Sequence, residues 1–261
     1  MRPKLAVLAA VPLLDLLLLD RLTGVESLTG LAAGALLQSA ILLPFLCCKR
    51  PSPQSRAIRL LLGIYCLTAA GFLLYRLALA FPLLNGVVPK RGVSLLLLIL
   101  VCGYAAKCGL KTLLRLAPAA AVFFLLAGCI LLAGRLGNAQ LHRISWQLSM
   151  PEPTAMLGFT GAELPALLIL SQDGRTARRA LLRLTLLKLS AAALLTVLIL
   201  SAGRMIQTAK LPVFTLAALS QPLQGQRADA VYLFAFVTLC VMAETLFLTL
   251  GIHLLRRKEL P

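Results

Sequence analysis

The sequence contains few charged residues for its length. Only 13% of its 261 residues are charged, with 9 Asp and Glu in total, whereas soluble domains usually carry about 25% charged residues. Hydrophobic residues make up 60% of the chain, and the mean hydropathy is +0.92. This composition excludes an ordinary soluble domain and predicts that the lipid bilayer is the solvent of the protein. The length fits a single integral membrane domain over 1–261.

The sequence also lacks the motifs of common enzyme families. It has two histidines, His142 and His253, and contains no phosphate-binding loop, no His-Glu-x-x-His and no Gly-x-Ser-x-Gly. Its seven cysteines stand mostly inside apolar runs and without metal-ligand spacing, and in such places cysteine behaves as a small hydrophobe. We therefore expect no enzymatic activity, no metal site and no cofactor.

Basic residues are the only charged class that is plentiful. The 26 Lys and Arg give a formal net charge of +17, which in a soluble protein would suggest a nucleic-acid partner. Here the basic residues stand in short runs between apolar segments, which is how the topology of membrane proteins is encoded. We therefore expect membrane lipid as the partner of these residues, and no nucleic acid.

Apolar segments recur along the chain at the length that a helix needs to cross the hydrocarbon, about 17–25 residues. They predict an all-α, polytopic transmembrane bundle of about eight spans. The expected spans are 5–20, 28–48, 60–84, 92–108, 115–134, 155–172, 183–203 and 230–255. A further apolar stretch, Leu211 to Leu219, is too short to span, and we expect it to lie in the interface or to re-enter partway.

The distribution of basic residues predicts the orientation. With the N-terminus in the cytoplasm, about twice as many Lys and Arg fall in cytoplasmic segments as in external ones. Lys188 is counted with the cytoplasmic group that begins at Arg175, and Arg76 lies within a span. Eight spans then put both termini in the cytoplasm.

Ionisable residues inside spans are functional candidates, because burying a charge in the membrane costs about 2.5–3.5 kcal/mol on insertion scales. Glu163 is the strongest candidate. It stands in Gly158-Phe-Thr-Gly161-Ala-Glu-Leu-Pro165, where two glycines and a proline disfavour a continuous helix. Transporters use such interrupted helices to aim backbone groups at substrates and ions. The alternative is a helix that starts late, with Glu163 solvated near the interface.

Three other ionisable residues lie inside the expected spans. Glu244 is central in the last span, where it either pairs with Arg76, lines the same cavity as Glu163, or makes a structural contact to a neighbouring helix. Arg76 is expected to snorkel or to pair structurally. Asp15 is expected to lie at a solvated outer end, since Asp20 and Arg21 follow closely.

Four motifs, in the same order, resemble the B subunit of bacterial endospore germinant receptors, the GerAB-type permeases. These motifs are Ile41-Leu-Leu-Pro44 before Lys49-Arg50, Gly103-Tyr-Ala-Ala-Lys-Cys-Gly109-Leu-Lys-Thr-Leu-Leu-Arg115, Phe159-Thr-Gly161-Ala-Glu163-Leu-Pro165, and Pro212-Val-Phe before Gln226-Arg227-Ala-Asp229. Members of this family are similar to amino-acid permeases of the APC superfamily, with a LeuT-like fold whose first and sixth helices are broken around a central site.

The resemblance implies a spore germination protein of the inner spore membrane that acts with an A-type subunit and a C-type lipoprotein subunit. It implies that a small amino-acid-like germinant binds at Gly158, Thr160, Gly161 and Glu163, with possible ion or proton coupling at Glu163 and Glu244. The family usually has ten helices, whereas the expected spans correspond to the first eight, so we expect a shortened fold.

The first span also lacks the glycine-rich break of the family, since it reads Leu13-Leu-Asp-Leu-Leu-Leu-Leu-Asp20. For this reason we expect sensing rather than active transport. Two alternatives remain open: an independent proton-coupled transporter for an amine or amino acid, and a membrane scaffold without a ligand.

Overall fold

The computed structural model of the chain describes residues 3–19, 25–47, 56–84, 91–136, 153–170, 174–202, 209–219 and 229–256. These residues are almost entirely helical and include no strand. The helices are α1 (Pro3–Leu17), α2 (Val25–Cys47), α3 (Arg56–Ala80), the 3-10 turn η1 (Phe81–Leu84), α4 (Arg91–Cys108), α5 (Leu110–Leu136), α6 (Pro153–Met156), α7 (Glu163–Leu170), α8 (Gly174–Ser201), α10 (Pro212–Leu219) and α11 (Asp229–Leu255).

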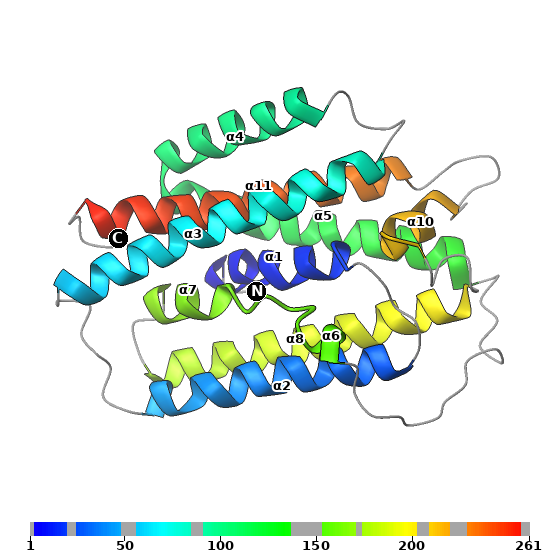
Figure 1. The fold of residues 1–261 in the computed structure, drawn as a ribbon, viewed down its shortest axis with the longest axis horizontal. Helices are drawn as coiled ribbons and strands as arrows, with labels where there is room; N and C mark the ends of the chain where they lie inside the picture. Colours follow the sequence, from blue (N-terminus) through cyan, green and yellow to red (C-terminus); the bar gives the residue numbers. More distant parts are fainter. Residues whose placement is uncertain are drawn as a thin grey trace.

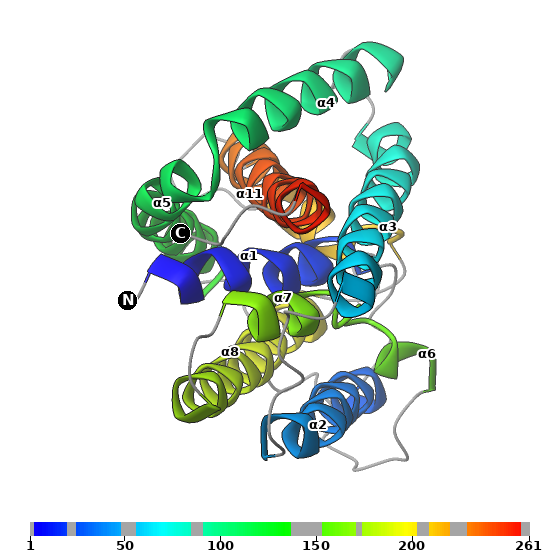
Figure 2. The ribbon, with the colours of Figure 1, turned by 90° about the vertical axis from the view of Figure 1, so that its left-hand side faces the viewer.

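The helices form one bundle with α1 at its centre (Figures 1 and 2). On one side of α1, α2 packs along α8, and the short α6 lies on α2. On the other side, α11 packs against α3, α4 and α5. In Figure 2 the helices α2 and α11 are seen nearly along their axes, whereas α1 lies across the view. The first helix therefore crosses the bundle obliquely and contacts both of its sides.

Burial explains why α1 can be shorter than a typical span. Nearly every side chain from Ala6 to Leu19 is buried, as expected of a helix that is hydrophobic all round and enclosed by other helices. At its end, the Tyr232 hydroxyl of α11 donates to the Leu17 carbonyl at 3.3 Å, which satisfies one of the carbonyls left free at a helix terminus. We conclude that α1 is the core of the bundle.

Five helical stretches are long and apolar enough to cross a membrane: Glu26–Pro44, Arg56–Ala80, Leu110–Cys129, Gly174–Leu200 and Ala230–Leu255. A shorter apolar helix covers Gly92–Cys108. Large apolar side chains remain exposed on these helices, among them Leu61 and Leu100, as is normal for a protein whose surroundings are lipid. The chain is therefore a membrane-embedded helical protein.

The helix bounds differ most from the expected spans in the second half of the chain. The span expected at 155–172 is divided between α6 and α7, and α8 begins nine residues before the expected 183–203. The apolar stretch at 211–219 forms α10, whose Val213 and Leu216 are buried, so it packs on α8 and α11 within the protein. At Gly109 a φ of 84° separates α4 from α5, and glycine tolerates this left-handed conformation without strain.

Candidate functional site

The interruption between α6 and α7 is the centre of the candidate site. The chain leaves α6 after Met156 and enters α7 at Glu163. Gly161 has a φ of 66°, and a Cβ added there would lie 3.1 Å from the side chain of Gln38. Pro165 stands in the first turn of α7, where its missing N–H removes no helical hydrogen bond. The glycine and the proline thus impose the break that the sequence predicted.

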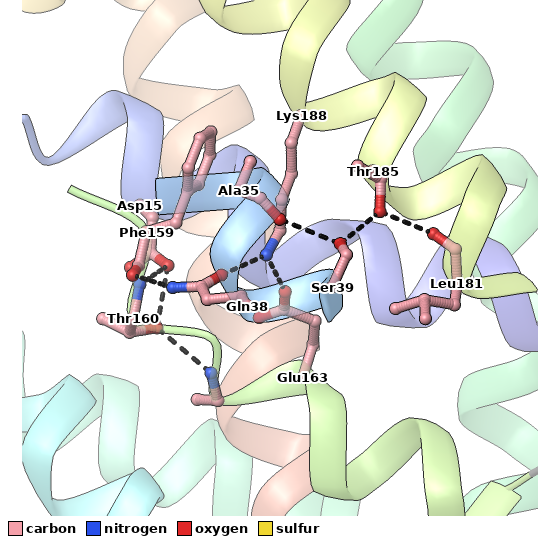
Figure 3. Close-up of polar contacts among 11 residues, drawn as sticks. Asp15, Ala35, Gln38, Ser39, Phe159, Thr160, Glu163, Leu181, Thr185 and Lys188 are labelled. Atoms are coloured by element: carbon pink, nitrogen blue, oxygen red, sulfur yellow. Dashed lines mark hydrogen bonds and ion pairs between the residues drawn. The ribbon is translucent and has the colours of Figure 1, made fainter. Parts of the chain in front are cut away.

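Asp15 of α1 binds the broken segment directly. Its Oδ2 accepts hydrogen bonds from the Thr160 backbone N–H at 2.9 Å and from the Thr160 hydroxyl at 2.8 Å, and these contacts are visible in Figure 3. Its Oδ1 accepts a hydrogen bond from the guanidinium of Arg76 in α3. Asp15 has no exposed surface, so the expectation of a solvated outer end was wrong, because this charge is neutralised inside the bundle. Arg76 forms a structural ion pair with Asp15, which was one of the two expectations for it.

A second ion pair lies at the other end of the break. Lys188 of α8 pairs with Glu163 at the start of α7, and both side chains are almost fully buried. Lys188 also donates to Gln38 Oε1 at 2.8 Å and stands 5.1 Å from the centre of the Phe159 ring, within the range of a cation–π contact. The expectation that Lys188 belongs to the cytoplasmic basic group was wrong, and so was the alternative of a solvated Glu163.

Gln38 of α2 joins the two halves of the site. Its amide nitrogen donates to the Phe159 carbonyl at 2.6 Å, while its amide oxygen accepts from Lys188 (Figure 3). Ser39 directly follows Gln38 in α2. Its hydroxyl lies 2.6 Å from the hydroxyl of Thr185, and this contact joins α2 to α8. Side chains from α1, α2, α3, α7 and α8 therefore meet at the broken segment.

The charges at the break cancel. Asp15 and Glu163 contribute two negative charges, and Arg76 and Lys188 contribute two positive charges. Because an isolated charge in a membrane-embedded bundle is expensive, this balance explains how four ionisable side chains are accommodated in one apolar core. It also means that changing any one of the four leaves a charge without its partner.

The four residues expected to bind ligand all lie in the break. Thr160 and Glu163 hold the polar positions, where each already has an internal partner. Gly161 supplies the turn, and Gly158 lies beneath Leu31, whose Cδ2 would be 2.5 Å from an added Cβ. Among the described residues no group of three or more His, Cys, Asp or Glu is close enough to hold a metal ion.

Glu244 does not join this site. It lies in α11, is fully buried, and neither carboxylate oxygen has a hydrogen-bond partner among the described residues. The pairing with Arg76 that the sequence allowed is not formed, because Arg76 pairs with Asp15. Of the family-like motif Gln226-Arg227-Ala-Asp229, residues 226–228 lie outside the described residues, and Asp229 begins α11.

Two residues of the site were missed from the sequence. Gln38 is a neutral side chain in an apolar helix and carries no charge signal. Lys188 had a readable signal in the phase of its helix, because it shares the buried face of Leu181, Leu184 and Ala192, whereas Arg183 is exposed. Residues spaced by three, four and seven lie on one helix face.

Comparison with protein-family models, with curated proteins and with solved structures gave no match in any of the three.

Proposed function

We propose that the chain is an integral membrane, permease-like subunit of the germinant-receptor B type, which senses a small amino-acid-like ligand at the break between α6 and α7. The observation that carries this proposal is the interrupted helix with two ion pairs, whose members come from α7 itself and from α1, α3 and α8. Irregular backbone inside a membrane protein is tolerated where it is enclosed by protein or lines a cavity, and broken helices of this kind form the binding sites of many transporters.

Ligand recognition would centre on Glu163. Its side-chain partner among the described residues is Lys188, which engages Oε1, and Oε2 has no hydrogen-bond partner there. A ligand ammonium group carries three donors and would compete with Lys188 for this carboxylate. Such an exchange would release α8 from α7, and a ligand that prefers the released arrangement would shift the population toward it. A-type and C-type subunits in the spore inner membrane would read this shift.

The eight-span topology with both termini in the cytoplasm belongs to the same proposal. Lys4 supports it, because its ammonium donates to the Leu170 carbonyl at 3.1 Å. This contact joins the start of α1 to the end of α7, two points that the proposed topology puts on the same side of the membrane.

Glu163→Gln is expected to weaken the binding of amino acids to the purified chain by roughly 10–100-fold, since hydrogen bonds to a charged group contribute about 1.5–3 kcal/mol. Equilibrium binding of a panel of radiolabelled amino acids measures this. The matched control is Glu26→Gln, which neutralises an exposed glutamate of α2 and should leave binding intact. Unchanged binding in Glu163→Gln would remove the site from Glu163. Co-purification with A-type and C-type subunits without any bound small molecule would favour the scaffold.

A second function, a proton-coupled carrier for an amine or amino acid, is favoured by Glu244. A buried carboxylate with no hydrogen-bond partner in the described part of the chain is expensive in its charged form and is suited to taking up a proton. Glu244→Gln is therefore expected to abolish uptake driven by a pH gradient in proteoliposomes while leaving ligand binding and folding intact. Glu26→Gln is again the control, and uptake that persists in Glu244→Gln, or is absent from the unmodified chain, counts against the carrier.

A further inference from the structure

We propose that the break between α6 and α7 contains a carboxylate-binding position that the protein fills with its own Asp15, so that a ligand of this site is recognised by its amino group and not by a carboxylate. The statement about the ligand rests on the proposed function. The statement about Asp15 stands on the contacts of the broken segment alone.

The donors around Asp15 form the arrangement expected of a site for a free carboxylate. A backbone N–H at the broken segment, a hydroxyl and a guanidinium all point at one carboxyl group. Backbone N–H groups next to helix starts attract anions, and in transporters with broken helices they commonly face the anionic group of the substrate. Here the anion is the side chain of Asp15 in α1, which lies 145 residues before Thr160 in the chain.

The anion position is also saturated. Each Asp15 oxygen accepts at least one hydrogen bond, and Oδ2 accepts two. Asp15 has no exposed surface, so an incoming carboxylate would find the donors of Thr160 and Arg76 already engaged. It would also have to displace an anion that is covalently attached to the bundle.

Glu163 is the opposite case. It is as deeply buried as Asp15, yet only its Oε1 is engaged, by the ion pair with Lys188, and its Oε2 has no hydrogen-bond partner among the described residues. Lys188 divides its ammonium between Glu163 and Gln38. The position that a ligand can improve is therefore the one that takes a cation, and the chemical class that fits is a primary amine, with or without a carboxylate.

Removing the Asp15 carboxylate should leave a position for a small carboxylate from solution. Asp15→Ala deletes a group of the size of formate, so the variant is expected to melt at a lower temperature than the unmodified chain and to recover most of that loss in a saturable manner with sodium formate. A ligand that binds only the folded state raises its stability in this way. The probe is formate, compared with sodium chloride at equal ionic strength, in thermal melts of the purified full-length chain.

Two controls make the result specific. Asp15→Asn keeps the volume of the side chain, so the position stays filled and formate should add nothing beyond chloride. In Asp15→Ala combined with Arg76→Gln, the guanidinium is gone and the formate effect should disappear. If Asp15→Ala does not survive purification, Asp15→Ser takes its place, since its shorter side chain also vacates the carboxylate position.

The proposal is overturned if formate stabilises the Asp15→Ala or Asp15→Ser variant no more than chloride does, or if it stabilises Asp15→Asn equally. This outcome differs from a failure of the proposed function, which would appear as the absence of amine or amino-acid binding by the unmodified chain. The formate experiment does not depend on the identity of the natural ligand, so each failure can be recognised separately.

Discussion

Replacing Lys188 with methionine is expected to destabilise the protein by about 3–5 kcal/mol, the usual effect of removing one partner of a buried ion pair. The substitution leaves Glu163 as a buried carboxylate without a counter-ion and removes the donor to Gln38 Oε1. Methionine fills a similar volume, so the loss reports on charge rather than on a cavity. Thermal melts followed with a thiol-reactive dye measure it, because Cys66, Cys102 and Cys240 are buried and become reactive as the chain unfolds.

The double variant separates charge from packing. In Lys188→Met combined with Glu163→Gln no net charge remains at this end of the break, and most of the lost stability should return. Arg183→Met is the matched control, because Arg183 is an exposed basic residue of the same helix, and exposed substitutions usually change stability by about 0.5 kcal/mol or less. Equal destabilisation by Lys188→Met and Arg183→Met would mean that the pair contributes nothing specific.

Local signals in the sequence were sufficient to predict the break. Gly161 and Pro165 act on their own neighbours, one through a left-handed φ and the other through a missing N–H, so their effect can be read from eight consecutive residues. The last helix could also be predicted from the sequence, since the expected span 230–255 begins one residue after the start of α11 and ends at its last residue. Uninterrupted apolar runs bounded by polar residues predict helices well.

The partners in the site are not local, and this is why they were not predicted. Arg76 is 61 residues from Asp15 along the chain, and Gln38 is 150 residues from Lys188. Sequence spacing carries no information on contacts that arise only when α1 is enclosed by the bundle. From the sequence, Asp15 was expected at a solvated end because Asp20 and Arg21 follow it. The burial of α1 instead requires that the charge of Asp15 be neutralised inside the bundle.

The position of the ion pairs links the fold to the proposed function. Both pairs lie at the break between α6 and α7: Asp15 of the first pair binds Thr160 in the break, and Lys188 of the second binds Glu163 at the start of α7. Interhelical hydrogen bonds in membrane proteins are individually modest, about 0.6 kcal/mol on average, so neutral contacts alone would hold a broken helix weakly. Ion pairs bind the broken helix more strongly, and a charged ligand could replace one partner of such a pair.

Gly34→Ala is expected to damage both stability and the site, because α6 crosses α2 at this residue. A Cβ at Gly34 would lie 2.2 Å from the Met156 carbonyl oxygen, a backbone atom with no rotamer to move. Overpacking of this kind usually costs about 1–3 kcal/mol. Gly34 lies one turn from Gln38 on α2, so pushing α6 away should also strain the bond from Gln38 to Phe159 and weaken amine binding.

Gly71→Ala is the control that distinguishes this clash from a general effect of alanine in a spanning helix. Nothing lies within 4 Å of the Cβ position at Gly71 of α3, and alanine favours the helix over glycine by about 1 kcal/mol, so this variant should melt at the same or a higher temperature than the unmodified chain. If α6 rests on Gly34, thermal melts should show a lower melting temperature for Gly34→Ala and an equal or higher one for Gly71→Ala. Ligand binding, measured on both variants, should be weakened in Gly34→Ala. A Gly34→Ala protein as stable as Gly71→Ala would mean that the broken segment does not need this contact, and the site would then depend on its two ion pairs alone.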